Sequence, residues 1–359
     1  MSRRGMIPLH LESSQYRYRA LIGTGGIGTG TFFALQGDET LGREESRLGY
    51  VLDRRDYCKL HIVSHYVKIL LGSEFAVLPL GYVGDDDAGG QLLREMQAID
   101  LDLTYLQQYP GYPTLFSFCL VYPDGSGGNL TTADSACSQV TAKTIEHAGE
   151  AFSRFQGQGI ALAMPEVPLE ARLRLLQLGR AQGLFCVGSF VSDEIGTVVR
   201  TPVLRSIDLL ALNIDEAAAV VRLSVEDSPL LTIIEQAIQT LRRIHPTMFI
   251  SITAGKQGSW IWDGALLSYL PSLEVDVKST AGAGDAHLSG LIAGLTAGLS
   301  LPQAHELATL MAALSVESEH TIHPGLDAQA LKIFAQFRHI AVCDGVKKLI
   351  RLFPFDQGG

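Results

Sequence analysis

Short apolar runs alternate with amphipathic stretches along most of this chain. Runs of the length and composition of buried strands cover residues 20–22, 75–80, 160–164, 184–187, 209–212 and 248–252. Helical spacing separates several of them, as in 169–182 and in 231–244, where Ile234, Ile238 and Leu241 share one face. Strands that alternate with helices predict βαβ units, a mainly parallel sheet and helices on both of its faces.

Two segments depart from this rhythm. Residues 31–57 are polar and rich in turn formers, and in 114–122 aromatic or apolar side chains recur at every second position before the glycine-rich run 123–128. A period of two followed by such a turn is typical of half-buried antiparallel strands. We expect the segments at about 29–57 and 112–133 to form a small β-sheet that acts as a lid on one α/β domain spanning residues 1–359.

Composition and charge narrow the classes of partner. The chain has 359 residues, of which 47% are hydrophobic and 18% charged, and its formal net charge is −10. Such a composition is typical of a globular protein with a large core. A strongly negative charge opposes attraction to nucleic acid and to anionic membranes, so we expect a small-molecule partner instead.

The location expected from sequence is the cytoplasm. No stretch reaches the roughly 18 uninterrupted apolar residues of a membrane span. Near the N-terminus, Pro8, His10 and Glu12 interrupt the apolar run that a signal peptide requires. The five cysteines are odd in number and form no Cys-x-x-Cys pair, which favours free thiols in a reducing compartment over disulfides or a zinc site.

The strongest chemical signal is the glycine-rich run 279–285, which follows the strand-like residues 273–277 and precedes an apolar helix. Backbone N–H groups at such a turn are free to face an anion, and the helix N-terminus adds partial positive charge. Gly282, Ala283 and Gly284 would form an anion hole, with Asp285 placed to accept the proton of an attacking hydroxyl. An ordinary turn with Asp285 as helix N-cap is the alternative interpretation.

The same run resembles the C-terminal signature of the ribokinase family, also called the PfkB carbohydrate kinases, usually written D-T-x-G-A-G-D-x-F. Thr280, Gly282 to Gly284 and Asp285 match it. Ser279 stands where the family usually has its first aspartate, and His287 where it usually has phenylalanine. In several members that aspartate helps to hold a monovalent cation, so a K⁺ requirement stays open. The resemblance implies a ribokinase-like α/β fold and ATP-dependent phosphorylation with Asp285 as the base.

Two further motifs occur in the family's order. Asn213 and Glu216 match the N-x-x-E motif, which in relatives organises Mg²⁺ and phosphates, largely through water. Mg²⁺ keeps several waters and needs few protein carboxylates, although a helix start capped by asparagine has the same sequence pattern. Thr253, Gly255 and Gly258 match the T-x-G-x-x-G loop at the nucleotide, for which a plain hairpin turn is the alternative. The resemblance therefore implies ATP and Mg²⁺, with Thr280 also on the nucleotide side.

The substrate half departs more from the family. Asp85 lies in a stretch resembling V-G-x-D-x-x-G. Where relatives carry G-G-x-x-x-N at the substrate pocket, this chain has Lys59, His61 and His65. These side chains suggest an acceptor other than a common free sugar, such as an anionic one, with surface residues on a helix as the alternative.

A glycine-rich segment at 23–28 fits the dinucleotide fingerprint G-x-G-x-x-G. That fingerprint requires a helix directly afterwards, whereas residues 29–33 favour extended chain. We therefore interpret Gly25 and Gly26 as backbone close to the substrate, together with Lys59 and Asp85.

The sequence thus predicts an ATP-dependent kinase for a hydroxyl of a sugar or sugar-like metabolite. A nucleoside kinase of the same family and a non-catalytic binding protein with the kinase fold are the alternatives, followed by an NAD-dependent oxidoreductase. The resemblance also implies a homodimer in which lid strands pair between subunits.

Overall fold

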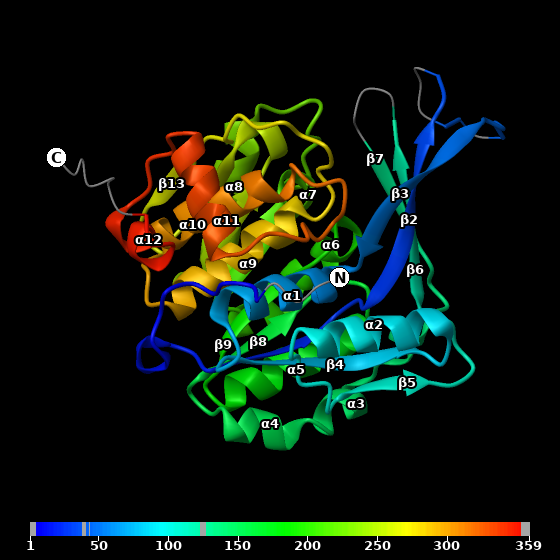
Figure 1. Ribbon diagram of the computed structural model, residues 1–359, viewed down its shortest axis with the longest axis horizontal. Helices are drawn as coiled ribbons and strands as arrows, with labels where there is room; N and C mark the ends of the chain where they lie inside the picture. Colours follow the sequence, from blue (N-terminus) through cyan, green and yellow to red (C-terminus); the bar gives the residue numbers. More distant parts are fainter. Residues whose placement is uncertain (1–4, 38–40, 43, 123–126, 353–359) are drawn as a thin grey trace.

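The computed structural model describes residues 5–37, 41–42, 44–122 and 127–352 (Figure 1). Within these ranges the strands form a nine-stranded sheet in the order β13-β12-β11-β10-β9-β8-β1-β4-β5 and a separate four-stranded sheet in the order β3-β2-β6-β7. Helices cover both faces of the large sheet, with one hydrophobic core on each face. The predicted fold class, a mainly parallel sheet flanked by helices with a small second sheet, is confirmed.

All six apolar runs predicted as strands lie in the large sheet. Within this sheet the strands pair in parallel, except for the antiparallel β11-β12 and β12-β13 pairs. Parallel strands are buried on both faces, which explains why they read as continuous apolar runs. The strands are β1 (Ala20–Thr24), β4 (Ala76–Gly84), β5 (Leu106–Tyr109), β8 (Gly159–Ala163), β9 (Phe185–Ser189), β10 (Leu209–Asn213), β11 (Phe249–Thr253), β12 (Ser259–Trp262) and β13 (Leu267–Leu270).

The strand expected at 273–277 is absent, and that prediction is wrong. Pro271 directly follows β13, and proline has no N–H to donate to a sheet. Leu273 and Val275 instead pack their side chains against the core. The alternating apolar pattern at 273–277 therefore reflects the burial of an irregular segment and not a strand.

The helices divide between the two core faces. On one face are α1 (Lys59–Leu71), α2 (Asp87–Ala98), α9 (Ala283–Thr296), α10 (Leu301–Ser315), α11 (Ala328–Phe337) and α12 (Asp344–Leu349). On the other are α3 (Ala142–Glu146), α4 (Gly149–Arg154), α5 (Leu169–Ala181), α6 (Ser192–Arg200), α7 (Ile214–Val221) and α8 (Leu230–Ile244). Short 3-10 turns cover Ser13–Gln15, Ala136–Gln139, Pro202–Ser206 and Gly255–Gln257.

The small sheet projects beside the large one (Figure 1). It contains β2 (Gly28–Leu35), β3 (Gly49–Tyr57), β6 (Leu115–Val121) and β7 (Gly127–Thr131), which come from the two segments that break the βα rhythm. Its movement as a lid on a single domain stays a prediction. Because β1 is followed by strand β2 and not by a helix, the glycines at 23–28 lack the strand–helix context of a dinucleotide site.

Two properties expected from the sequence concern membrane-spanning helices and the state of the cysteines. Across the described part of the chain, no helix has the length and apolar character needed to cross a membrane. All five cysteines are free, and only Cys343 is partly exposed. Free thiols were the expectation from their odd number and spacing.

Two buried histidines pack against each other between α9 and α10. The rings of His287 and His305 are 5.5 Å apart with an interplanar angle of 77°, and the Ser259 hydroxyl lies 2.6 Å from His305 Nε2. Burial, with a smaller effect of His305, lowers the pKa of His287 to about 3. His287 therefore belongs to the neutral core and not to the surface of the glycine-rich turn.

We expect His287→Phe to weaken the acid sensitivity of folding. A histidine with a native pKa of about 3 stays neutral when folded but protonates below about pH 6.5 when unfolded. Stability is therefore lost as the pH falls below 6.5, by about 2 kcal/mol for one such histidine at pH 5. Urea unfolding at pH 8 and pH 5 measures this difference. Equal pH dependence of wild type and variant would contradict the assignment.

Candidate active site

The glycine-rich turn leads directly into α9. Gly282 is the residue before the helix and has a φ of 80°, and a Cβ there would lie 2.6 Å from the carbonyl oxygen of Thr321. The N–H of Ala283 donates to the carbonyl of Thr280 at 3.2 Å. Among the described residues, no acceptor is found for the N–H groups of Gly284 and Asp285. The amides free to bind an anion are thus those of Gly284 and Asp285, and Ala283 contributes through the turn.

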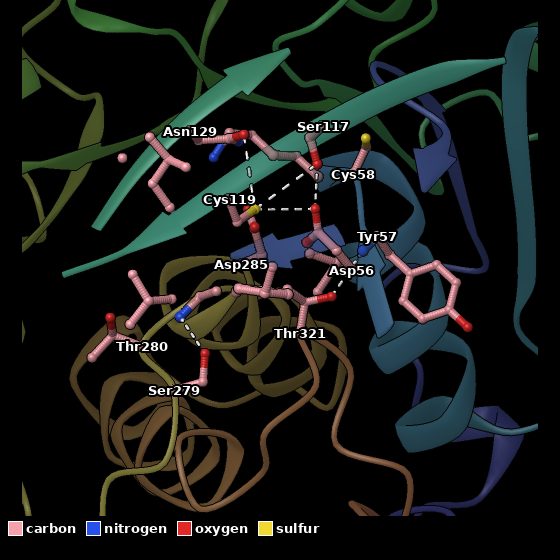
Figure 2. Close-up of a pocket in the computed structure, with 18 of the residues that line it drawn as sticks. Asp56, Tyr57, Cys58, Ser117, Cys119, Asn129, Ser279, Thr280, Asp285 and Thr321 are labelled. Atoms are coloured by element: carbon pink, nitrogen blue, oxygen red, sulfur yellow. Dashed lines mark hydrogen bonds between the residues drawn. The ribbon is translucent and has the colours of Figure 1, made fainter. Parts of the chain in front are cut away.

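Asp285 lines a cavity of about 410 Å³ between the small sheet and the starts of α1 and α9 (Figure 2). Side chains far apart in sequence meet here because the strand ends of both sheets converge on it. The polar and charged residues that line it are Asp56, Tyr57, Lys59, Ser117, Asn129, Glu166, Lys278, Ser279, Thr280, Asp285 and Thr321. Cys58 and Cys119 add two thiols.

A second cavity of about 850 Å³ adjoins the first. It is lined by residues of β7, of the loops after β8 and β9, and by Asn213 and Glu216 at the start of α7. Lys59, Asn129 and Glu166 line both cavities. The two spaces therefore meet at Lys59.

Lys59 is the first residue of α1 and the central cation of the site. The Asp285 carboxylate raises the pKa of Lys59 above its ordinary value against the effect of burial, and Glu166 and Glu216 act in the same direction. The lysine is therefore charged at neutral pH. It is the one sequence-predicted substrate residue that the structure places in both cavities.

Of the carboxylates around Lys59, Glu216 is buried and Glu166 and Asp285 are partly exposed, and all three resist ionisation. Burial raises the pKa of Glu166 to about 7 and that of Glu216 to about 7, with Lys59 opposing both shifts. Burial also raises the pKa of Asp285, which Lys59 opposes and Asp56 reinforces. Perturbed carboxylates gathered in a cavity are typical of functional sites.

Glu166 was missed in the sequence because it belongs to no local motif. It follows β8 with a φ of 77°, and its Oε2 accepts the backbone N–H of Lys59 at 3.2 Å. The available signal was its position just after a buried parallel strand, where ligands bind in open α/β sheets. Asp56, at the end of β3, was missed for the same reason.

Gly25 and Gly26 lie behind this group and line neither cavity. A Cβ on Gly26 would lie 2.1 Å from Glu166 Oε2, and one on Gly25 would lie 2.5 Å from the Cβ of Met164. Gly26 also joins the loop after β8, since its N–H donates to Pro165 at 2.9 Å. Their contribution in this structure is to let Glu166 approach α1.

Asn213 and Glu216 form a reciprocal helix cap. Asn213 Oδ1 accepts the N–H of Glu216 at 2.8 Å, and Glu216 Oε2 accepts the N–H of Asn213 at 2.8 Å. Both line the larger cavity. No group of three or more His, Cys, Asp or Glu side chains is placed to hold a metal within the described ranges. One carboxylate and one amide suit Mg²⁺, which keeps most of its waters.

Other predicted site residues lie outside the two cavities. Asp85 is exposed at the β4–α2 turn, and its neighbour Asp86 caps α2 through a 2.8 Å bond from the N–H of Gly89. Thr253, Gly255 and Gly258 belong to the β11–β12 hairpin, whereas Thr280 lines the smaller cavity.

His61 and His65 do not contribute to an anion-binding pocket. Both lie within α1 and line neither cavity, and burial lowers the pKa of His61 to about 4 and that of His65 to about 3. They are neutral at physiological pH. The argument for an anionic acceptor therefore loses two of its three cationic side chains.

Gly282→Ala and Gly284→Ala form a matched pair that tests the turn. Alanine at the left-handed Gly282, facing the Thr321 carbonyl, is expected to lower the free energy of unfolding by about 2 kcal/mol or more. At Gly284 a Cβ meets nothing within 4 Å, and alanine in a helix stabilises by about 0.5–1 kcal/mol. Denaturant unfolding of both variants measures this, and equal losses would show that the turn geometry is not strained.

Comparison with known proteins agrees with the geometry. Residues 67–329 match the family model described as pfkB family carbohydrate kinase. Over 68 residues the chain is 38% identical to fructoselysine 6-kinase of Shigella flexneri and to that of Escherichia coli (strain K12). These matches cover 19% of this chain and only 26% of each relative's length.

Solved structures share the whole architecture. Ribokinase from Cryptococcus neoformans var. grubii serotype A, in complex with ADP, is 20% identical with a TM-score of 0.73, covering 88% of this chain and 99% of that one. A nucleoside kinase of Burkholderia thailandensis, in complex with inosine, is 18% identical with a TM-score of 0.67, covering 88% and 97%. At such identities these structures establish the ribokinase-like fold. Because the family match runs from α1 to α11, this chain belongs to the pfkB family of carbohydrate kinases.

Proposed function

We propose that the protein transfers the γ-phosphoryl group of ATP to a hydroxyl of a sugar or sugar-like molecule. The observation that carries this proposal is the position of Asp285, which lines a cavity beside the unpaired amides that begin α9. A base next to an anion hole supplies what phosphoryl transfer asks of a protein, namely positioning and electrostatic stabilisation.

In the proposed reaction the acceptor hydroxyl donates its proton to Asp285. The hydroxyl oxygen forms a bond to the γ-phosphorus while the bond from that phosphorus to the oxygen of ADP breaks. The amides of Gly284 and Asp285 and the Lys59 ammonium stabilise the charge on the transferred group. The raised pKa of Asp285 suits a group that must accept a proton in mid-reaction.

The nucleotide side is assigned by the family motifs. Thr253, Gly255 and Gly258 at the β11–β12 hairpin, with Thr280, are proposed to hold ATP. Asn213 and Glu216 are proposed to hold Mg²⁺ through its waters, where the ion neutralises phosphate charge. The capped geometry supports this, since it fixes both side chains at the rim of the larger cavity.

The acceptor side consists of Lys59 and Glu166 below the small sheet. Gly25 and Gly26 support it from behind, and Asp85 could contact only an acceptor that reaches the surface. We further propose that the small sheet closes on the cavity. It exposes Tyr50, Val51 and Leu130, and Leu48 just before β3 is exposed as well; these apolar side chains suit pairing with a second copy of the chain.

A panel assay of ADP release tests the proposal. Purified protein with ATP and Mg²⁺ is incubated with sugars, amino sugars, sugar phosphates and nucleosides in separate wells. Acceptor-dependent ADP release is the expected result, and selective turnover of nucleosides would favour the nucleoside-kinase alternative supported by the resemblance to the Burkholderia enzyme. Binding of acceptors without any turnover would replace the kinase proposal with a binding protein.

A further inference from the structure

A carboxylate on the small sheet forms the wall of the smaller cavity opposite the glycine-rich turn. Asp56 is the penultimate residue of β3 and is only 4% exposed, yet it lines this cavity. Figure 2 shows Asp56, Ser117 and Cys119 gathered on the small-sheet side, with Asp285 reaching toward them from the helix side. An acceptor whose hydroxyl meets Asp285 therefore has its next atoms close to Asp56.

Among the described residues, Asp56 has neutral hydrogen-bond donors and no ion pair. The Ser117 hydroxyl donates to Asp56 Oδ2, and the Cys119 thiol donates to the same oxygen at 3.3 Å. No ion pair within 4.0 Å joins Asp56 to any cation in the part of the chain that the structure describes. Lys59 interacts most strongly with Asp285, and its charge is the smallest of the effects that lower the pKa of Asp56, which burial raises.

The wall of the smaller cavity therefore carries an excess of negative charge on the side of the small sheet. Asp56, Glu166 and Asp285 line it together with Lys59 and the exposed Lys278. The Asp56 carboxylate raises the pKa of both Asp285 and Glu166, although burial is the larger cause of each shift. An anionic group at this wall is repelled, and a neutral hydroxyl leaves the buried charge uncompensated. A cationic group offsets it.

We propose that Asp56 selects acceptors that carry a positively charged amine close to the reacting hydroxyl, such as an amino sugar or a sugar joined to an amine. This inference rests on the proposed kinase function and narrows its substrate class. A cationic acceptor thus takes the place of the anionic acceptor that the sequence suggested.

Matched acceptor pairs test the inference. Glucosamine is compared with N-acetylglucosamine, and 1-amino-1-deoxyfructose with fructose, as kcat/KM in wild type, Asp56→Asn and Asp56→Glu. We expect wild type to prefer the amine of at least one pair by about tenfold or more, Asp56→Glu to keep that preference and Asp56→Asn to lose it. Asp344→Asn, which removes the same charge from exposed α12, is the control for a long-range effect.

The outcomes separate this inference from the kinase proposal. Equal or better turnover of the neutral members by wild type, or an equal loss for both members in Asp56→Asn, would overturn the role of Asp56 and leave the kinase intact. Where no acceptor is turned over, calorimetric binding of the same pairs still decides, because only a cation-selective Asp56 makes binding of the amine depend on the carboxylate. Thermal unfolding of each variant checks that the isosteric asparagine leaves the fold intact.

Discussion

Asp285→Asn is expected to lower kcat by about 10²–10⁴-fold, the usual contribution of a general base. The amide keeps the shape of the side chain and cannot accept the proton of the acceptor hydroxyl. Binding of ATP and acceptor should persist, because the amides of the turn and Lys59 are unchanged. Thermal stability should be equal or higher, since the variant removes a partly exposed carboxylate whose pKa is raised by desolvation.

Steady-state kinetics and calorimetric binding measure the two effects separately. Asp344→Asn is the matched control, because Asp344 also lies in the first turn of a helix but is exposed on α12. Its kcat should equal that of wild type. A kcat for Asp285→Asn within a few-fold of wild type would remove Asp285 from the chemistry and return it to the role of a helix-start residue.

Lys59→Met is expected to lower kcat by about 10²–10³-fold, as the loss of one stabilising group at a transferring anion does. It should also move the acid limb of the pH–rate profile to higher pH. Asp285 works when deprotonated, so activity is present above its pKa and is lost as the pH falls through it. Lys59 lowers the pKa of Asp285, and of Glu166 and Glu216, so its removal raises all three.

The pH profile distinguishes this electrostatic effect from simple loss of binding. Lys59→Arg keeps the charge and should keep the acid limb near its wild-type position, even where the longer side chain lowers kcat. An acid limb that stays unchanged in Lys59→Met would show that Lys59 does not act on the base. A profile shifted equally in both variants would point to altered packing at the start of α1.

The sequence was sufficient for features that are encoded locally. Buried parallel strands read as apolar runs because both faces are covered, and the turn before α9 reads as a motif partly because the left-handed backbone at Gly282 favours glycine. The cap formed by Asn213 and Glu216 is similarly a property of four consecutive residues. The capping interpretation is confirmed, and the Mg²⁺ role of the pair stays a prediction, which the position of both residues on a cavity wall supports.

Features that depend on tertiary arrangement were not predictable. Glu166 reaches the cavity because the loop after β8 packs on Gly26 and α1, and Asp56 because β3 pairs with β2 beside β6. Neither contact can be recognised from the residues that flank Glu166 or Asp56 in the sequence. His61 and His65 failed as pocket residues because neither lines a cavity, whereas Lys59 at the first position of α1 lines both.

The junction between β3 and α1 has a further consequence. Only Tyr57 and Cys58 separate Asp56 from Lys59. The residue proposed to select the acceptor and the cation proposed to serve phosphoryl transfer therefore lie in one short segment of the chain. A chimaera that exchanges β3 and the start of α1 with the same segment of a relative would move both together. Acceptor preference and turnover should therefore change together in such a chimaera. Substitutions in this segment that alter one of these two properties are expected to affect the other.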